Sequence, residues 1–365
     1  MKGNVLKKFL CTCLVTAAAF AATTISASAC TTIYVGGDLV EEGTPFVART
    51  EDYGSDYNKL WFISESGKWK QGDHYVGCPE YGPFEWDFTH DSYRFTYFTN
   101  DIYYDGICPE CGEKADHYSY TECGTNEKGV SVSATETLYG NKKVTEADPY
   151  RDAEWAEANK SERIGIEETD IPTIILAEAS SAREGVKLLL DIYENYGCVA
   201  ASGVFVCDKD EVWYVENCSG TQYVAIKLND NMIFLEPNMA VIGRVDLDDE
   251  NVIASKDLIA VAKKAGTFVG DEAKNIIDFR ASYARISEKM DQRMIDGLNY
   301  LNVAYKYDSD ALVTDNTKFT ISNLDASDKL VALYTNIKAD RKLDKDDVFG
   351  YYKLSSIGKA SNQEI

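Results

Sequence analysis

The sequence predicts an α+β protein with a largely antiparallel sheet. Short runs of β-branched and aromatic residues cluster at 30–49 and again at 203–227, where tight turns join them. Segments with helical apolar spacing lie at 171–196 and 255–265. Strands that cluster, instead of alternating one by one with helices, are typical of layered α+β proteins.

The first strand cluster is a β-hairpin. Residues 30–35 and 44–49 are its strands, and the segment between them, which begins and ends with glycine, is its turn. Arg49 and Asp52 fall where the second strand ends. With the hairpin in register, both residues lie near the level of Cys30.

The remaining elements follow from apolar periodicity and turn residues. Ser180 or Ser181 is expected to cap a second helix inside the segment 171–196. The segment 66–122 is rich in Tyr, Gly and Asp and holds all three histidines, so we expect an insertion or lid on a single domain spanning 30–365. The other predicted strands are 129–135, 203–207, 212–216, 222–227 and 233–235, and the predicted helices lie within 171–196, 255–265 and 282–294.

The N-terminus has the pattern of a secretory signal peptide. Three lysines accompany a mostly apolar run over 9–22, and Ala27-Ser28-Ala29 forms a small-residue cleavage site. Removal of residues 1–29 leaves Cys30 as the first residue of a secreted or cell-surface protein. Its α-amine has a pKa near ~8, so the thiol nucleophile and a general base lie on one residue.

Two other interpretations of Cys30 stay open. It can carry a lipid anchor, although Ala27 stands where such signals usually have Leu, or it can be half of a disulfide. A histidine-assisted cysteine protease needs a histidine beside the nucleophile. The only histidines are His74, His90 and His117, all in the irregular segment. This favours the self-contained amine mechanism.

Composition narrows the classes of partner. The chain of 365 residues carries 60 acidic and 37 basic side chains, a net charge of −23. A strongly acidic surface argues against nucleic acid or an anionic membrane as a partner. After the N-terminal segment no apolar run is long enough to span a bilayer. The oligomeric state is left open between a monomer and a homo-oligomer.

Several stretches together resemble one known family. They run in that family's order across nearly the whole mature chain, and the third is the most specific. The chain resembles the N-terminal-nucleophile cysteine dipeptidases of the dipeptidase A type, which are distant relatives of penicillin V acylase and bile salt hydrolase. The stretches are ACTTI (29–33), VARTED (47–52), TNEKGVSVSATET (125–137), EVWYVE (211–216), IGRVDLDD (242–249) and IGKASNQE (357–364).

The resemblance implies a four-layer αββα sandwich, the N-terminal-nucleophile hydrolase fold, and hydrolysis of an amide bond in a dipeptide or small peptide. It implies neither a metal nor an organic cofactor. Cys30 matches the nucleophile, and Arg49 and Asp52 match the pair beside it. A cation such as Arg49 lowers the pKa of a neighbouring thiol. A carboxylate such as Asp52 holds an ammonium group through a charge-assisted hydrogen bond.

Three further residues are carried over from the family. Asn238 matches the asparagine of the oxyanion hole, where a side-chain amide N–H stabilises the tetrahedral intermediate. Arg285 best matches the last active-site arginine, with Arg280 close enough to compete in the alignment. Glu136 stands where the acylases carry a second oxyanion donor. Since an ionised carboxylate cannot donate, we expect it to bind the free amino group of a peptide substrate.

The alternatives to a dipeptidase are an acyl-amide hydrolase, acting on bile salts or penicillin V, and a lipid-anchored surface protein without catalysis.

A separate feature is the cysteine group at 78, 108, 111 and 123, in which CPEC (108–111) resembles half of a zinc knuckle with His117 nearby. A structural zinc site needs four ligands, and a second pair with this spacing is absent. Disulfides are the favoured interpretation, and no metal is expected.

Overall fold

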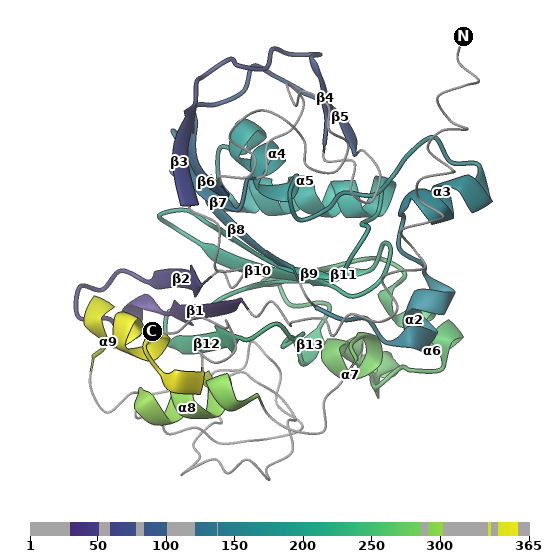
Figure 1. The fold of residues 1–365 in the computed structure, drawn as a ribbon. Coiled ribbons are helices and arrows are strands. Elements are labelled where there is room, and N and C mark those ends of the chain that lie inside the picture. The colour runs from purple at the N-terminus through teal and green to yellow at the C-terminus, as the bar shows by residue number, and fades with distance from the viewer. Residues whose placement is uncertain are drawn as a thin grey trace.

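The structure, a computed structural model, describes residues 30–50, 59–77, 84–100, 121–136, 138–285, 291–301, 335–336 and 342–356. Of Asn100, Thr135, Glu136, Thr335 and Asn336 it describes the backbone only. The described strands form two main sheets, and helices lie on their outer faces (Figure 1). The predicted α+β class with largely antiparallel sheets is confirmed.

The larger sheet has eight strands among the described residues, in the order β14-β11-β10-β9-β8-β7-β6-β3, and every neighbouring pair is antiparallel. Its centre is the predicted meander of β9, β10 and β11. The strands are β3 (Lys59–Ser64), β6 (Phe95–Asn100), β7 (Cys123–Asn126), β8 (Ser131–Glu136), β9 (Ser202–Cys207), β10 (Val212–Asn217), β11 (Tyr223–Lys227) and β14 (Val252–Ala254).

The smaller sheet holds the first described strand, which directly follows Cys30. Its order is β17-β12-β1-β2, with β1 (Thr31–Val35), β2 (Phe46–Thr50), β12 (Met232–Glu236) and β17 (Thr335–Asn336). The predicted hairpin is confirmed, since Thr31 lies opposite Thr50 and Thr32 opposite Arg49. The strand expected at 233–235 exists as β12, but it pairs with β1 and does not extend the meander.

Part of the segment 66–122 is regular structure. β4 (His74–Val76) and β5 (Glu85–Asp87) form a separate hairpin, and β6 is an inner strand of the larger sheet between β3 and β7. The described part is therefore not an irregular insertion throughout. A further small sheet has the order β13-β16-β15, from β13 (Arg244–Asp246), β16 (Ile276–Asp278) and β15 (Gly270–Asp271).

The two main sheets pack face to face on an aromatic core. The ring of Phe234 on β12 lies 5.7 Å from that of Phe205 on β9 and 4.7 Å from that of Tyr214 on β10. All three residues are buried. Such aromatic pairs add to the free energy gained from burying apolar area, and they fix the spacing of the sheets.

Helices cover the outer faces. α4 (Ile171–Glu178) and α5 (Ala182–Asn195) pack on the face of the larger sheet that lies away from β1, β2 and β12 (Figure 1). Ser181 caps α5 by accepting from the backbone N–H of Glu184, as predicted. On the other side α8 (Gln292–Tyr300) contacts β12 and α9 (Lys345–Tyr352) contacts β2. The other helices are α2 (Lys142–Ala147), α3 (Ala153–Asn159), α6 (Leu258–Ala265), α7 (Phe279–Tyr283) and the 3-10 turns η2 (Gly37–Leu39) and η4 (Glu272–Lys274).

One helix prediction is wrong. Residues 282–294 were expected to form a helix, but α7 ends at Tyr283 and α8 begins at Gln292. Ala284 is extended and forms a β-bridge with Gly140, which removes it from any continuous helix. Within the described ranges, no helix combines the length and the apolar character that crossing a membrane requires.

Candidate active site

Cys30 lies immediately before the central strand of the smaller sheet. Only 7% of it is exposed. β1 is hydrogen-bonded on both sides, to β12 and to β2, so the start of the strand is fixed in place. The backbone N–H of Thr31 also donates to Thr50 Oγ1 at 3.1 Å, and the hydroxyl of Tyr352 on α9 donates to the Thr31 carbonyl at 3.2 Å.

Arg293 on α8 contacts Cys30 directly. Its Nη1 donates to the carbonyl oxygen of Cys30 at 2.9 Å and to Thr31 Oγ1 at 3.0 Å. Its Nη2 donates to the carbonyl oxygen of Pro237 at 2.6 Å. Asp291, the N-cap of α8, accepts from Nε at 3.0 Å and so orients the guanidinium. Only 8% of the Arg293 side chain is exposed, so the hydrogen bonds of its guanidinium are shielded from water.

Arg293 also determines how the side chain of Asn238 is oriented. Nη1 of Arg293 lies 3.2 Å from Asn238 Oδ1. A guanidinium only donates, so the amide oxygen faces Arg293 and the NH₂ end forms the other branch of the side chain. Asn238 has a φ of 54°, a left-handed conformation that asparagine tolerates better than most residues. One cation therefore connects the Cys30 backbone with a side-chain amide donor.

Two buried carboxylates lie beside this turn. Glu236 is the last residue of β12 and Glu216 lies in β10, and both have 0% exposure. Burial raises the pKa of Glu236 to about 7, while Arg293 and Arg49 act in the opposite direction. Burial raises the pKa of Glu216 to about 8, and the charge of Glu236 adds to that rise.

Arg49 joins the smaller sheet to the larger one. Its Nη1 donates to Ser133 Oγ at 3.3 Å and to the carbonyl oxygens of Ala134 and Glu122. Its Nη2 lies 4.0 Å from Glu168 Oε1, and 8% of the Arg49 side chain is exposed. The hairpin register brings Arg49 beside Thr32, two residues after the cysteine, close to the level expected from the sequence.

Three other predicted residues have different outcomes. Asp52 lies outside the described residues. The backbone of Glu136 ends β8 opposite Ser202, and its side chain is not described. Arg285 is exposed, and its guanidinium lies 4.0 Å from the ring centre of Tyr139. Its described contacts do not include Cys30, whereas Arg293 contacts that residue directly.

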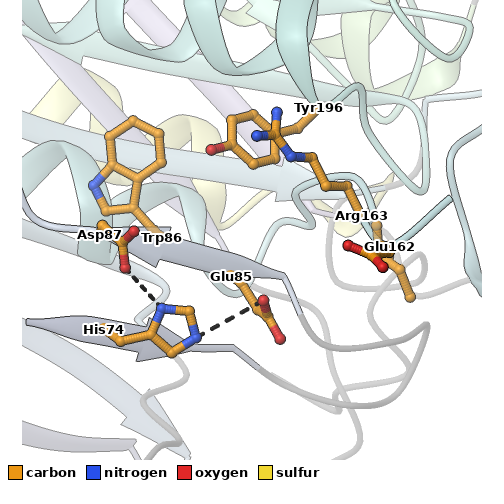
Figure 2. A pocket seen from close by; sticks show the side chains of 8 residues that line it. His74, Glu85, Trp86, Asp87, Glu162, Arg163 and Tyr196 are labelled. Atoms are coloured by element: carbon orange, nitrogen blue, oxygen red, sulfur yellow. Dashed lines mark hydrogen bonds and ion pairs between the residues drawn. The ribbon is translucent and has the colours of Figure 1, made fainter.

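The described histidines are engaged on the other side of the larger sheet. His74 on β4 lies between Asp87, at 2.8 Å, and Glu85, at 3.8 Å, and helps line a cavity of about 150 Å³ (Figure 2). Tyr196, at the end of α5, lines the same cavity.

His90 contacts the carbonyl oxygen of Glu178 at the end of α4. His117 lies outside the described residues.

The described cysteines differ sharply in their surroundings. Cys198 and Cys218 are buried, and burial raises the pKa of both thiols. Cys123 lies on β7 at intermediate burial, while the other three members of the predicted cysteine group, at 78, 108 and 111, lie outside the described residues. No cluster of three metal-ligating side chains occurs in the part of the chain that the structure describes.

A comparison with known families decides the family. The model of "Peptidase family C69" matches residues 29–329. The chain belongs to peptidase family C69. The match begins one residue before Cys30, and it confirms the recognition made from the sequence motifs.

Several family C69 relatives are dipeptidases by name. The chain is 33% identical to a probable dipeptidase B of Streptococcus pyogenes over 247 residues, which are 67% of this chain and 44% of that protein. It is 32% identical to a probable dipeptidase of Salmonella dublin over 262 residues, 70% of this chain and 53% of that protein. The chain thus spans about half the length of these relatives. Among solved structures, penicillin V acylase from Agrobacterium tumefaciens matches with a TM-score of 0.32 and 14% identity, over 57% of this chain and 49% of that one.

In this family C69 chain, sequence reasoning missed Arg293. A signal for the helix start was present, because Asp291 is of a residue type favoured at the N-cap. Nothing local indicated that Arg293 reaches Cys30, which is 263 positions away. Glu216 is the last residue of the motif EVWYVE (211–216), and Glu236 directly follows the predicted strand 233–235, but neither pattern indicated a role in the site.

Proposed function

We propose that this chain is an exported cysteine dipeptidase that hydrolyses the amide bond of dipeptides, with Cys30 as an N-terminal nucleophile. The observation that carries the proposal is the Arg293 guanidinium, which contacts both the Cys30 carbonyl and the Asn238 amide oxygen. This brings the thiol residue and a side-chain N–H donor to one point. Membership of a peptidase family, with relatives named dipeptidases, supports the substrate class.

The reaction needs two steps at Cys30. The thiol passes its proton to the α-amine, and Sγ attacks the scissile carbonyl. The Asn238 amide and backbone N–H groups hold the oxyanion while the ammonium returns its proton to the leaving amine. The resulting thioester is then hydrolysed by water, with the free amine again as the base.

The remaining predicted residues fit around these steps. Arg49, held against β8 by Ala134 and Ser133, supplies positive charge near the nucleophile strand. Asp52 is proposed to hold the α-ammonium and Glu136 the amino group of the substrate. Arg293 is proposed in place of Arg285 as the arginine of the site, because it contacts both the nucleophile residue and Asn238.

The fold is proposed to be the four-layer αββα sandwich of the N-terminal-nucleophile hydrolases. Helices α4 and α5, the larger sheet, the smaller sheet, and helices α8 and α9 would be its successive layers. The buried rings of Phe205, Tyr214 and Phe234 would be the contact between the two inner layers.

Export is part of the proposal and follows from the signal peptide pattern over residues 1–29. Mass spectrometry of protein recovered from outside an expressing cell should find a mature chain that starts at an unmodified Cys30. A diacylglyceryl mass on Cys30 would instead support the lipid-anchored alternative, since that modification blocks the amine.

The substrate class is tested with two panels. Mature protein should hydrolyse a mixed dipeptide panel and leave N-acyl glycine substrates untouched. Turnover should survive a metal chelator and be lost after thiol alkylation. Hydrolysis of the N-acyl panel alone would instead identify an acyl-amide hydrolase. Activity retained after alkylation would contradict the cysteine mechanism.

A further inference from the structure

The turn after β12 is fixed from the smaller sheet by Glu236. Residues 237–242 carry Asn238 and leave the sheet immediately after this glutamate. The backbone N–H of Met239 donates to Glu236 Oε1 at 3.1 Å. Glu236 itself lies opposite Thr32 on the nucleophile strand. The carboxylate thus links the strand paired with β1 to the backbone N–H of the residue after Asn238.

Glu216 fixes the same turn from the larger sheet. The backbone N–H of Val241 donates to Glu216 Oε1 at 2.6 Å, and that of Ile242 donates to Oε2 at 3.1 Å. Both carboxylate oxygens therefore accept from consecutive residues of the turn. Glu216 lies opposite Gly203 in the sheet. A Cβ at Gly203 would approach Tyr214 Oη to 2.3 Å, so this part of the sheet is closely packed.

Stability alone does not account for this arrangement. Removing a carboxylate from water carries a large desolvation penalty, and well-packed apolar side chains are often more stabilising than buried charges. Glu216 and Glu236 are both fully buried and lie close enough to repel one another. Apart from a hydrogen bond between Glu216 and the Tyr214 side chain, their described hydrogen bonds go to the backbone of one turn, and that turn carries Asn238.

We infer that Glu216 and Glu236 are positioning residues for amide hydrolysis, holding the 237–242 turn from both sheets so that the Asn238 side chain stays beside Cys30. The inference rests on the proposed function, in which Asn238 donates to the oxyanion. The two carboxylates act through the backbone of the turn. Arg293 acts on the Asn238 side chain itself, by donating to its amide oxygen. A misplacement of about 1 Å at such a donor can cost about 10²-fold in rate.

Replacement by glutamine should affect kcat differently at the two positions. Glu216 in its ionised form uses both oxygens as acceptors, so above about pH 8 Glu216→Gln turns an NH₂ group toward a backbone N–H and loses one hydrogen bond. Glu236 Oε2 has no hydrogen-bond partner among the described residues, so Glu236→Gln can keep its contact with Met239. Glu216→Gln should therefore have the larger effect.

A double-mutant cycle on the full mature chain tests the inference. Loss of an oxyanion donor typically lowers kcat by about 10²–10³-fold, so Glu216→Gln should lower kcat by about 10–100-fold with KM within about twofold. In an Asn238→Ala background the same change should lower kcat by less than about threefold, because the donor it positions is gone. Unchanged kcat in the single variant, or equal losses in both backgrounds, would overturn the inference.

Glu178→Gln is the matched control. Glu178 is also a buried carboxylate that accepts a backbone N–H, from Thr89, but on α4 at the far face of the larger sheet. It should leave kcat within about twofold even if it lowers the melting temperature as much as Glu216→Gln does. An equal loss of kcat in this control would reduce the Glu216 effect to general destabilisation and overturn the inference.

Two further readouts cover the remaining outcomes. If Glu216→Gln does not fold, the cycle of Glu236→Ala, which removes the acceptor of the Met239 N–H, with Asn238→Ala decides by the same criterion of non-additive kcat. If wild-type protein hydrolyses no dipeptide, the proposed function fails separately, and deuterium uptake by the segment 237–243 tests the positioning. Faster uptake in Glu216→Gln than in Glu178→Gln supports it, and equal uptake overturns it.

Discussion

The guanidinium of Arg293 and the carbonyl oxygen of Cys30 are 2.9 Å apart, across 263 positions of sequence. The same nitrogen lies 3.2 Å from Asn238 Oδ1. A buried, permanently charged donor thus joins the proposed nucleophile residue to the proposed oxyanion donor. This relationship accounts for how the start of β1, the turn after β12 and helix α8 come together.

Arg293→Lys should lower kcat/KM by at least about 100-fold, because a single ammonium cannot replace a planar fork that contacts Cys30, Pro237 and Asn238 together. It should also lower the free energy of unfolding by about 3 kcal/mol, since buried acceptors lose their donor. Steady-state kinetics and urea unfolding measure both. Arg285→Lys is the comparison, and a larger kinetic loss there would return the role to the arginine predicted from the sequence.

Arg49→Gln should impair both activity and folding stability. The side chain is nearly buried and joins β2 to β8 through Ser133 and the carbonyl of Ala134. We expect a stability loss of about 1–3 kcal/mol and a fall in kcat of at least about tenfold. Lys263→Gln is the control, because both members of its ion pair with Glu272 are exposed and the pair should contribute little. Equal effects at the two positions would contradict the role given to Arg49.

The predictable part of the site came from local pattern. The hairpin and its register follow from two β-branched runs, and they bring Arg49 to the level of Cys30. Asn238 followed from the resemblance. Arg293 could not be found in this way, because its contacts are long-range and because residues 282–294 looked like one helix. The β-bridge between Ala284 and Gly140 interrupts this predicted helix, and no local sequence pattern predicts the bridge.

Other differences have similar physical causes. β6 lies in a segment whose Tyr, Gly and Asp content resembled a loop, yet it is an inner strand paired to β3 and β7. β12 follows the meander in sequence but pairs with β1, because sheet pairing is decided by tertiary packing and not by proximity along the chain. Glu216 and Glu236 are ionisable residues in otherwise apolar strands. Their contacts with the 237–242 turn depend on the tertiary structure and leave no local sequence pattern.

Stability should fall as pH rises from about 5 to about 8. Burial raises the pKa of Glu236 to about 7 and that of Glu216 to about 8, above the usual carboxyl value of 4.5. In this window the folded state binds more protons than the unfolded state, so raising the pH favours unfolding. The groups that face Glu236 are Arg293 on α8, Arg49 on β2, Tyr351 on α9 and Glu216 on β10.

Glu236→Gln removes one of these titrating groups. The loss of unfolding free energy between pH 5.5 and pH 8 should shrink by about 1–3 kcal/mol relative to wild type, because one pKa unit corresponds to about 1.4 kcal/mol. Urea unfolding at the two pH values measures the difference. An unchanged or steeper fall in the variant would show that this carboxyl is ionised throughout the window.

Alkylation should discriminate among the cysteines. Burial raises the pKa of the Cys198 and Cys218 thiols, so both should stay protonated and unreactive. Cys30, whose thiol has its own amine as base in the proposed mature form, should react with iodoacetamide at least about tenfold faster. Peptide mass spectrometry after brief labelling of folded protein gives the rates. Equal labelling of all three would speak against an activated thiol.

The most direct test of the account compares dipeptide turnover by four forms of the protein: the chain starting at Cys30, its Cys30→Ser and Cys30→Ala variants, and a chain with one glycine placed before Cys30. The extended form keeps the thiol but removes the free α-amine from the nucleophile residue. We predict turnover by the chain starting at Cys30 and a loss of at least about 100-fold in Cys30→Ala and in the extended form. Full turnover by the extended form would contradict the amine as general base, and full turnover by Cys30→Ala would contradict Cys30 as the nucleophile.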